Sequence, residues 1–97
     1  MTHIVMMKFE EGFFCDAVTA RISDAFAALA QALPEEILAV QVEENCVQRP
    51  VNMDLMIRMT LAGEQSLSVY LNHPIHVEIS GAINPHIVSR CSFDYGR

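Results

Sequence analysis

The sequence predicts an α+β fold of the ferredoxin-like kind, in which a β-α-β-β-α-β order of elements forms a four-stranded antiparallel sheet with its helices on one face. Two observations predict it. Strand-like and helix-like patterns follow one another in this order without a low-complexity linker, and the chain is 97 residues long. Because that length suffices for one hydrophobic core, we expect a single domain over residues 1–97.

The first third of the chain predicts a strand followed by a long helix. The strand covers His3–Phe9, which is apolar, contains β-branched residues and ends at a charged segment with a glycine. Asp16 is the predicted N-cap of the helix, and Pro34 ends it. Apolar residues recur in this helix at steps of three and four, which places them on one face: Val18, Ile22, Phe26, Leu29 and Leu33.

Two more strands are predicted in the middle of the chain. They cover Ile37–Val47 and Met53–Leu61, and the intervening residues 48–52 contain a proline and an asparagine, as is typical of a turn. In the second of these strands the apolar residues alternate and share one face: Leu55, Ile57, Met59 and Leu61.

The last third predicts a second helical region and a final strand. The helical region begins at residues 63–65, is broken or restarted at Pro74, and is closed by Pro85. The final strand covers Ile87–Tyr95.

Apolar residues on the second faces of the strands predict a partner. Ile4, Met6 and Met56 alternate with the core-facing residues and so point away from the helices. Because an apolar sheet face needs a cover, we expect a homodimer in which two copies pair through their sheet faces and form an α/β barrel.

Charge and cysteine usage disfavour several classes of protein. The net charge is −6 and the six basic residues are scattered, so nucleic acid is not an expected partner. No apolar run is long enough to cross a membrane and no secretion signal opens the chain, which favours a cytoplasmic location. The cysteines, Cys15, Cys46 and Cys91, are odd in number and widely spaced, so we expect small buried side chains rather than disulfides or a zinc ribbon.

Five segments carry a family resemblance in their order and spacing: His3–Phe9, Leu33–Ile37, Asp54-Leu55, Tyr70–His76 and Phe93–Tyr95. The first strand with its histidine and the Y-L-x-H-P-x-H segment are together the most specific. Over essentially its whole length the chain resembles the dimeric stress-responsive α/β-barrel (Dabb) family.

The resemblance implies a ferredoxin-like subunit and a homodimeric barrel. Many members of the family have no assigned chemistry, whereas the plant member olivetolic acid cyclase performs an aldol-type cyclisation of a polyketide without a metal or an organic cofactor. On this resemblance Tyr70 and His76 match a catalytic pair and His3 matches a pocket histidine.

The chemistry of these residues agrees with that role. Alternation places His3 on the face of its strand that would lie beneath the second helical region, which carries Tyr70 and His76. A histidine removes a proton from an activated methylene near neutral pH, and a tyrosine hydroxyl stabilises the developing enolate. The residues expected to shape the surrounding apolar pocket are Val5, Met7, Phe26, Leu29, Ile57 and Met59.

Other interpretations of the same residues stay open. His76 is equally consistent with a structural role beside Pro74, bonded to a backbone carbonyl, with Tyr70 packed in the core. A metal site from His73 and His76, with His3 or His86 nearby, is disfavoured because Pro74 interrupts the helical spacing and no carboxylate accompanies the pair. We therefore expect no metal and no cofactor.

Three functions follow in decreasing order. The first is a homodimer, without assigned chemistry, that holds a small apolar ligand between sheet and helices. The second is a cofactor-independent lyase or cyclase acting on a polyketide-like or aromatic substrate, with His76 as general base and Tyr70 as its partner. The third, by analogy of fold alone, is a monooxygenase of the dimeric α/β-barrel type.

Overall fold

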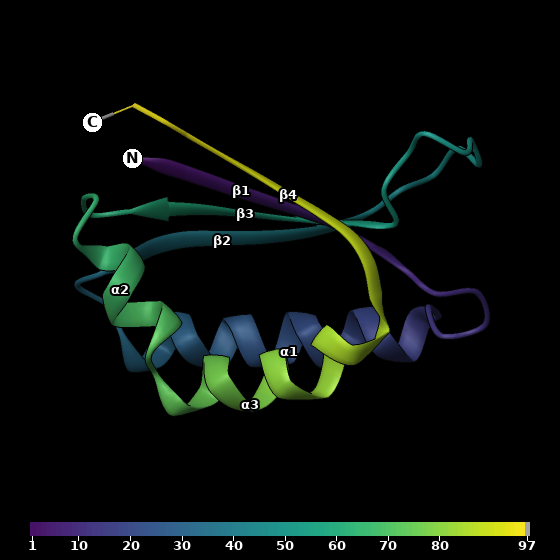
Figure 1. The fold of residues 1–97 in the computed structure, drawn as a ribbon. Coiled ribbons are helices and arrows are strands. Elements are labelled where there is room, and N and C mark those ends of the chain that lie inside the picture. Colours follow the sequence, from purple (N-terminus) through teal and green to yellow (C-terminus); the bar gives the residue numbers. More distant parts are fainter. Residues whose placement is uncertain (97) are drawn as a thin grey trace.

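A four-stranded antiparallel sheet forms one layer of the structure and the helices form the other (Figure 1). The computed structural model describes residues 1–96, so residue 97 of the expected domain lies outside it. The strands are β1 (Thr2–Phe9), β2 (Ile37–Glu44), β3 (Leu55–Leu61) and β4 (Ile87–Tyr95). Their spatial order is β2-β3-β1-β4, which is the order of the ferredoxin-like sandwich, and the predicted fold class is confirmed.

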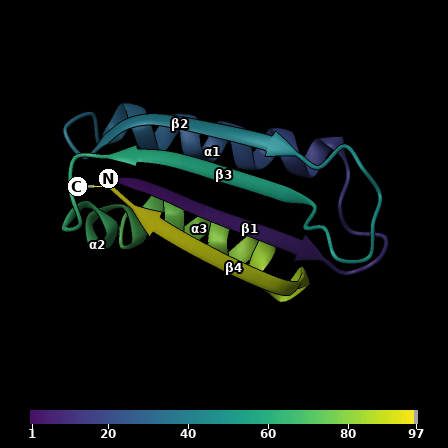
Figure 2. The ribbon, with the colours of Figure 1, turned by 90° about the horizontal axis from the view of Figure 1, so that it is seen from above.

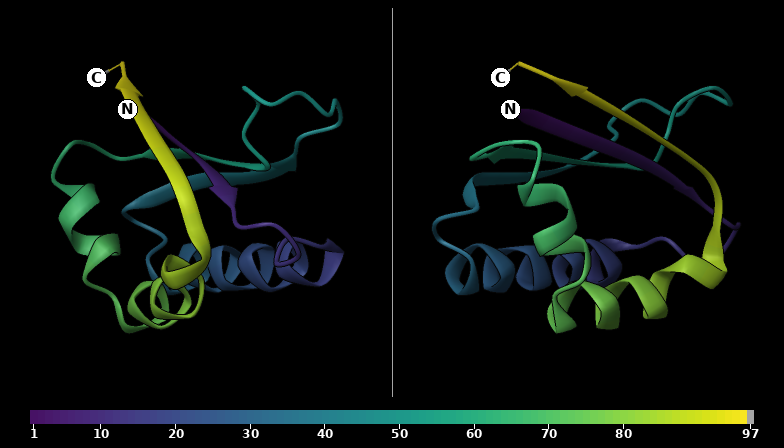
Figure 3. Two further views of the ribbon diagram at one scale, coloured as in Figure 1. Left: turned by 45° about the vertical axis from the view of Figure 1, so that its right-hand side comes forward. Right: turned by 60° about the vertical axis from the view of Figure 1, so that its left-hand side comes forward.

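All the helices cover the same face of the sheet. Seen from above, α1 (Asp16–Ala32) runs beneath β2 and β3, and α3 (Pro74–Ile83) runs beneath β1 and β4 (Figure 2). The short helix α2 (Ser66–Leu71) lies at one end of the sheet, and the 3-10 turn η1 (Asn84–His86) joins α3 to β4. The views in Figure 3 show that the opposite face of the sheet carries no helix.

The core lies between the sheet and the helices. The apolar face predicted for β3 is confirmed, because Leu55, Ile57, Met59 and Leu61 are each at most 1% exposed. From α1, the predicted residues Ile22, Phe26 and Leu29 are buried against them. Both patterns follow from the periods of strand and helix.

Some predicted boundaries were wrong. Cys15, in an extended conformation, is the N-cap of α1, and Asp16 is instead its first helical residue, where a carboxylate complements the helix dipole. The strands β2 and β3 are shorter than predicted, because side chains close the connection between them. Asn45 donates to the carbonyl of Val47 over 2.7 Å, and Asn52 donates to Asn45 over 3.1 Å.

Pro74 restarts the second helical region instead of kinking it. It occupies the first turn of α3, where its missing N–H costs nothing. His73 is the N-cap, and its ring nitrogen Nδ1 accepts a hydrogen bond from the amide of Ile75 at 3.1 Å. Pro74 therefore separates α2 from α3. Tyr70 lies near the end of α2, and His76 lies in the first turn of α3.

The edge strand β4 presents a polar face to the helices. Its register with β1 pairs His3 with Asp94, Val5 with Ser92, and Met7 with Arg90. Since His3, Val5 and Met7 face the helices, so do their partners on β4. The intervening residues Cys91, Phe93 and Tyr95 point the other way and are exposed.

The expectation that the cysteines are buried was wrong. Cys15, Cys46 and Cys91 are all exposed and free, because they lie at the start of α1, in the loop after β2 and on the outer face of β4. Within residues 1–96 no helix combines the length and apolarity needed to cross a membrane.

Candidate functional site

A cavity of about 200 Å³ lies between the helix-facing side of β1 and β4 and the helices α2 and α3. Its lining includes His3, Tyr70 and His76, so the structure brings the three predicted site residues to one space. The cavity exists because β4 contributes polar side chains here, whereas β3 contributes closely packed apolar ones.

The six predicted pocket residues divide into two groups. Val5, Met7, Phe26 and Ile57 line the cavity. Leu29 and Met59 do not, since both are 0% exposed and fill the core behind it. The apolar wall is therefore narrower than the sequence predicts.

A chain of hydrogen bonds joins three elements at this cavity. His3 on β1 contacts Asp94 on β4 through Nδ1, and its Nε2 lies 2.9 Å from the hydroxyl of Tyr70 on α2. A carboxylate oxygen can only accept a hydrogen bond, so Nδ1 of His3 carries a proton and donates a hydrogen bond to Asp94. In the neutral ring Nε2 is then an acceptor, and the Tyr70 hydroxyl donates to it.

Tyr70 stays protonated over the whole physiological range. Burial, followed by the negative charge of Asp94, raises its pKa to about 12 from the ordinary 10.0, and the positive charge of Arg90 opposes the shift. Both raising effects penalise the phenolate. Tyr70 is therefore a hydrogen-bond donor or acceptor at this site and not a phenolate base.

His76 is held as a neutral imidazole with one free nitrogen. Its Nδ1 donates to the backbone carbonyl of Leu71 over 3.1 Å, which leaves the lone pair on Nε2. Burial lowers the pKa of His76 below its ordinary 6.5; the Leu71 hydrogen bond opposes this shift and the positive charge of Arg90 adds to it. At neutral pH the ring is a proton acceptor.

Aromatic contacts fix the orientation of His76. Its ring meets the ring of Tyr70 edge-on with centroids 5.2 Å apart, and it meets Phe26 in the same manner at 6.1 Å. Among residues 1–96 no hydrogen bond joins Tyr70 to His76, although both line the cavity.

Sequence reasoning missed the polar side chains that β4 contributes. Asp94 orients His3, while Arg90 and Ser92 line the cavity. The sequence did carry a signal for these side chains, because polar residues alternate at positions 90, 92 and 94. In the structure they pair with the residues of β1 that share a face with His3.

The other two histidines have structural positions. His73 caps α3, and His86 stacks on Phe13 with centroids 4.0 Å apart and contacts Glu10. Within the described part of the chain, no three histidine, cysteine, aspartate or glutamate side chains are close enough to hold a metal ion.

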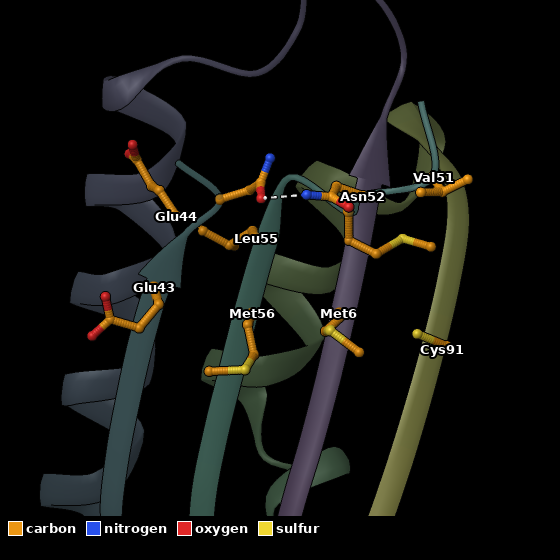
Figure 4. A pocket seen from close by; sticks show the side chains of 10 residues that line it. Met6, Glu43, Glu44, Val51, Asn52, Leu55, Met56 and Cys91 are labelled. Atoms are coloured by element: carbon orange, nitrogen blue, oxygen red, sulfur yellow. Dashed lines mark hydrogen bonds between the residues drawn. The ribbon is translucent and has the colours of Figure 1, made fainter. Parts of the chain in front are cut away.

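A larger and more open hollow, of about 550 Å³, lies on the opposite face of the sheet (Figure 4). Met6, Met56 and Cys91 form its floor, and the loop between β2 and β3 borders it with Val51 and Asn52. It contains no hydrogen-bonded pair of titratable groups among the residues described. The hydrogen-bonded pair of His3 and Tyr70 lies at the smaller cavity.

Comparison with known proteins assigns the whole chain to one family model. The stress responsive A/B barrel domain (Dabb) matches residues 1–96. No curated protein matches the sequence.

Solved structures agree on the fold. A dimeric ferredoxin-like protein of unknown function from Thermobifida fusca is 23% identical, with TM-score 0.79, and the match covers 99% of this chain and 89% of that one. A dimeric protein of unknown function from Bacteroides fragilis is 21% identical, with TM-score 0.81 and coverage of 99% and 94%. Hydroxynitrile lyase from Passiflora edulis is 13% identical, with TM-score 0.76 and coverage of 97% and 89%.

The high pKa of Tyr70 predicts a late titration in alkali. The chain has two tyrosines and no tryptophan, so in a Tyr95→Phe variant the absorbance near 295 nm reports Tyr70 alone. We expect a midpoint near pH 12. Because the folded pKa lies above the ordinary 10.0, the stability associated with this group is present below about pH 10 and is lost as the pH rises toward 12.

The matched control is Tyr70→Phe, which removes this contribution to the alkaline loss of stability. A reversible titration of the folded Tyr95→Phe protein at pH 10 would contradict the burial and hydrogen bonding of Tyr70.

Proposed function

The chain belongs to the stress responsive A/B barrel (Dabb) domain family, and we propose that it is a cofactor-independent lyase or cyclase. In this proposal the enzyme abstracts a proton from a carbon next to a carbonyl group of an aromatic or polyketide-like substrate. The observation that carries the proposal is the convergence of Tyr70 and His76 on one open cavity. Two purely structural residues have no need of such a space.

His76 is the general base. Its Nδ1 is engaged by Leu71, so the proton moves from the substrate carbon to Nε2. The lowered pKa keeps this nitrogen unprotonated at pH 7. Transfer of the proton leaves an enolate on the substrate, and His76 becomes an imidazolium able to return the proton after carbon–carbon bond formation or cleavage.

Tyr70 stabilises the enolate oxygen. With a pKa of about 12 it retains its proton, and it donates a hydrogen bond to the oxygen on which negative charge develops. In the resting site its hydroxyl donates to Nε2 of His3, so donation to substrate requires the O–H bond of Tyr70 to rotate from His3 toward the cavity. The contact of Asp94 with Nδ1 holds the His3 ring beside this hydroxyl. Asp94 and His3 are therefore positioning residues for Tyr70.

The apolar wall favours an aromatic or extended carbon substrate. Val5, Phe26 and Ile57 offer contact area without hydrogen-bonding groups in their side chains. The hydroxynitrile lyase of Passiflora edulis shares the fold, and its name indicates that this architecture supports a lyase in one protein.

Proton abstraction is testable without knowledge of the natural substrate. In D₂O the wild-type protein is expected to accelerate exchange of the methyl protons of acetophenone, followed by proton NMR, and 2-heptanone serves as a linear alternative. His76→Gln is expected to reduce the exchange rate at least about 100-fold, because the base is lost. The thermal midpoint should change by only a few degrees.

His86→Gln is the matched control, since His86 lies outside the cavity and its loss leaves the exchange rate unchanged. If wild-type protein binds these ketones but does not accelerate exchange, the catalytic proposal is wrong and a binding role takes its place.

We further propose that the chain forms a homodimer through the helix-free face of its sheet. This face carries Ile4, Met6, Met56, Phe93 and Tyr95, and Phe93 is 64% exposed. Water contact with so many neighbouring apolar groups is unfavourable, and a second copy related by a two-fold axis would cover them. The similar proteins from Thermobifida fusca and Bacteroides fragilis are described as dimeric, which supports the proposal.

Sedimentation equilibrium at micromolar concentration tests the assembly. The wild-type protein is expected at about twice the chain mass of 10.8 kDa. Phe93→Lys places a charge within the proposed interface and is expected to shift the mass toward that of one chain.

Val77→Lys is the control, because Val77 is similarly exposed but lies on α3, away from this face. A monomeric wild-type mass at this concentration would refute the dimer.

A further inference from the structure

Arg90 is the cationic side chain at the cavity. It lies on the helix-facing side of β4 opposite Met7, and it belongs to the cavity lining together with Tyr70 and His76. Side chains alternate along β4, so Arg90 points to the same side of this edge strand as Asp94.

The guanidinium of Arg90 is oriented but not neutralised. Its Nη2 donates to the side-chain oxygen of Asn84, at the end of α3. Within residues 1–96 it forms no ion pair, and Asp94, the acidic residue next along this face of β4, is engaged by His3. Four of the five N–H groups of a guanidinium remain for other partners.

The charge of Arg90 acts at the reacting groups. Burial is the main cause of both pKa shifts, because it raises the pKa of Tyr70 and lowers that of His76. The positive charge of Arg90 lowers the pKa of both groups. Any ligand in contact with Tyr70 and His76 therefore lies within reach of this cation.

The size of the cavity restricts the ligand. A cavity of about 150 Å³ accommodates one benzene molecule. The cavity at this site is about 200 Å³, which leaves room for a single ring, or a short chain of equal volume, with small substituents.

We infer that Arg90 selects a substrate with a carboxylate group, so that the preferred ligand is a one-ring or short-chain carbonyl compound that is also a monocarboxylic acid. A planar guanidinium pairs with a carboxylate through two parallel hydrogen bonds. A single negative charge suits the site better than a dianion, because Asp94 lies on the same face and the chain has a net charge of −6. The carbonyl group of this ligand is inferred from the proposed function, on which the inference rests. The carboxylate group is inferred from Arg90.

The test compares two probes that differ in charge but not in shape. Isothermal titration calorimetry with benzoate and with benzamide measures the preference for the anion. Wild-type protein is expected to bind benzoate about 10- to 100-fold more tightly than benzamide, as for a charge-assisted hydrogen-bonded pair. Added salt should weaken benzoate binding alone.

Variants locate the preference. Arg90→Gln is expected to lose the benzoate preference while keeping the weak benzamide affinity, and Arg90→Lys is expected to recover part of it. Arg21→Gln is the matched control, because Arg21 is exposed on α1 outside the cavity, and it should behave as wild type.

The outcomes separate this inference from the proposed function. Benzoate preference that depends on Arg90, together with ketones that bind but do not exchange their protons, supports the carboxylate site and refutes the catalyst. Equal affinity for the two probes, absence of benzoate binding, or a preference that survives Arg90→Gln would overturn the inference, whatever the exchange assay shows.

Discussion

The antiparallel pairing of β1 with β4 is the constraint on which the rest of the structure depends. Side chains alternate along a strand, so a register that pairs His3 with Asp94 also pairs Val5 with Ser92 and Met7 with Arg90. It thereby directs the polar residues of β4 toward the helices and Phe93 away from them. A slip by one residue would reverse both faces of the strand.

One register therefore has two consequences for function. On the helix side it prevents tight apolar packing, leaves the cavity and supplies its lining with Arg90 and Ser92. On the other side it exposes Phe93 and Tyr95, which the proposed dimer would cover. The site and the assembly surface thus occupy opposite faces of the same strand.

The hydrogen-bond chain at the cavity also connects distant parts of the sequence. Asp94 is 91 positions from His3, and Tyr70 is 67 positions from it. Correct placement of Tyr70 therefore requires both ends of the chain to be in the sheet. His76 forms no hydrogen bond with that chain, because its Nδ1 donates to the local carbonyl of Leu71; its ring contacts Tyr70 and Phe26.

Much of the fold was predictable because local patterns determine it. The buried face of β3 and the stripe on α1 have the periods of strand and helix, and Pro74 marks the start of α3. The N-cap of α1 was assigned one residue late, since Cys15 precedes the helix without a side-chain cap that a sequence rule recognises. The lengths of β2 and β3 depend on hydrogen bonds within their loop.

The site was predictable only in part. His3, Tyr70 and His76 were identified from residue type and family resemblance, and the structure brings all three to one cavity. Asp94 and Arg90 were missed, because their placement depends on the register between two strands from opposite ends of the chain. Leu29 and Met59 were placed in the pocket although they fill the core, since the boundary between core and cavity depends on packing in three dimensions.

The protein fixes the proton positions on His3 and His76, so that Nε2 of His3 accepts from Tyr70 and Nε2 of His76 keeps its lone pair. Long-range ¹H–¹⁵N correlation spectra of the four histidines at pH 8, assigned with His→Gln variants, measure this directly. Both rings are expected to carry a proton on Nδ1, and Asp94→Asn is expected to disturb His3 but not the proton position of His76. A ring whose only proton lies on Nε2 would refute this assignment.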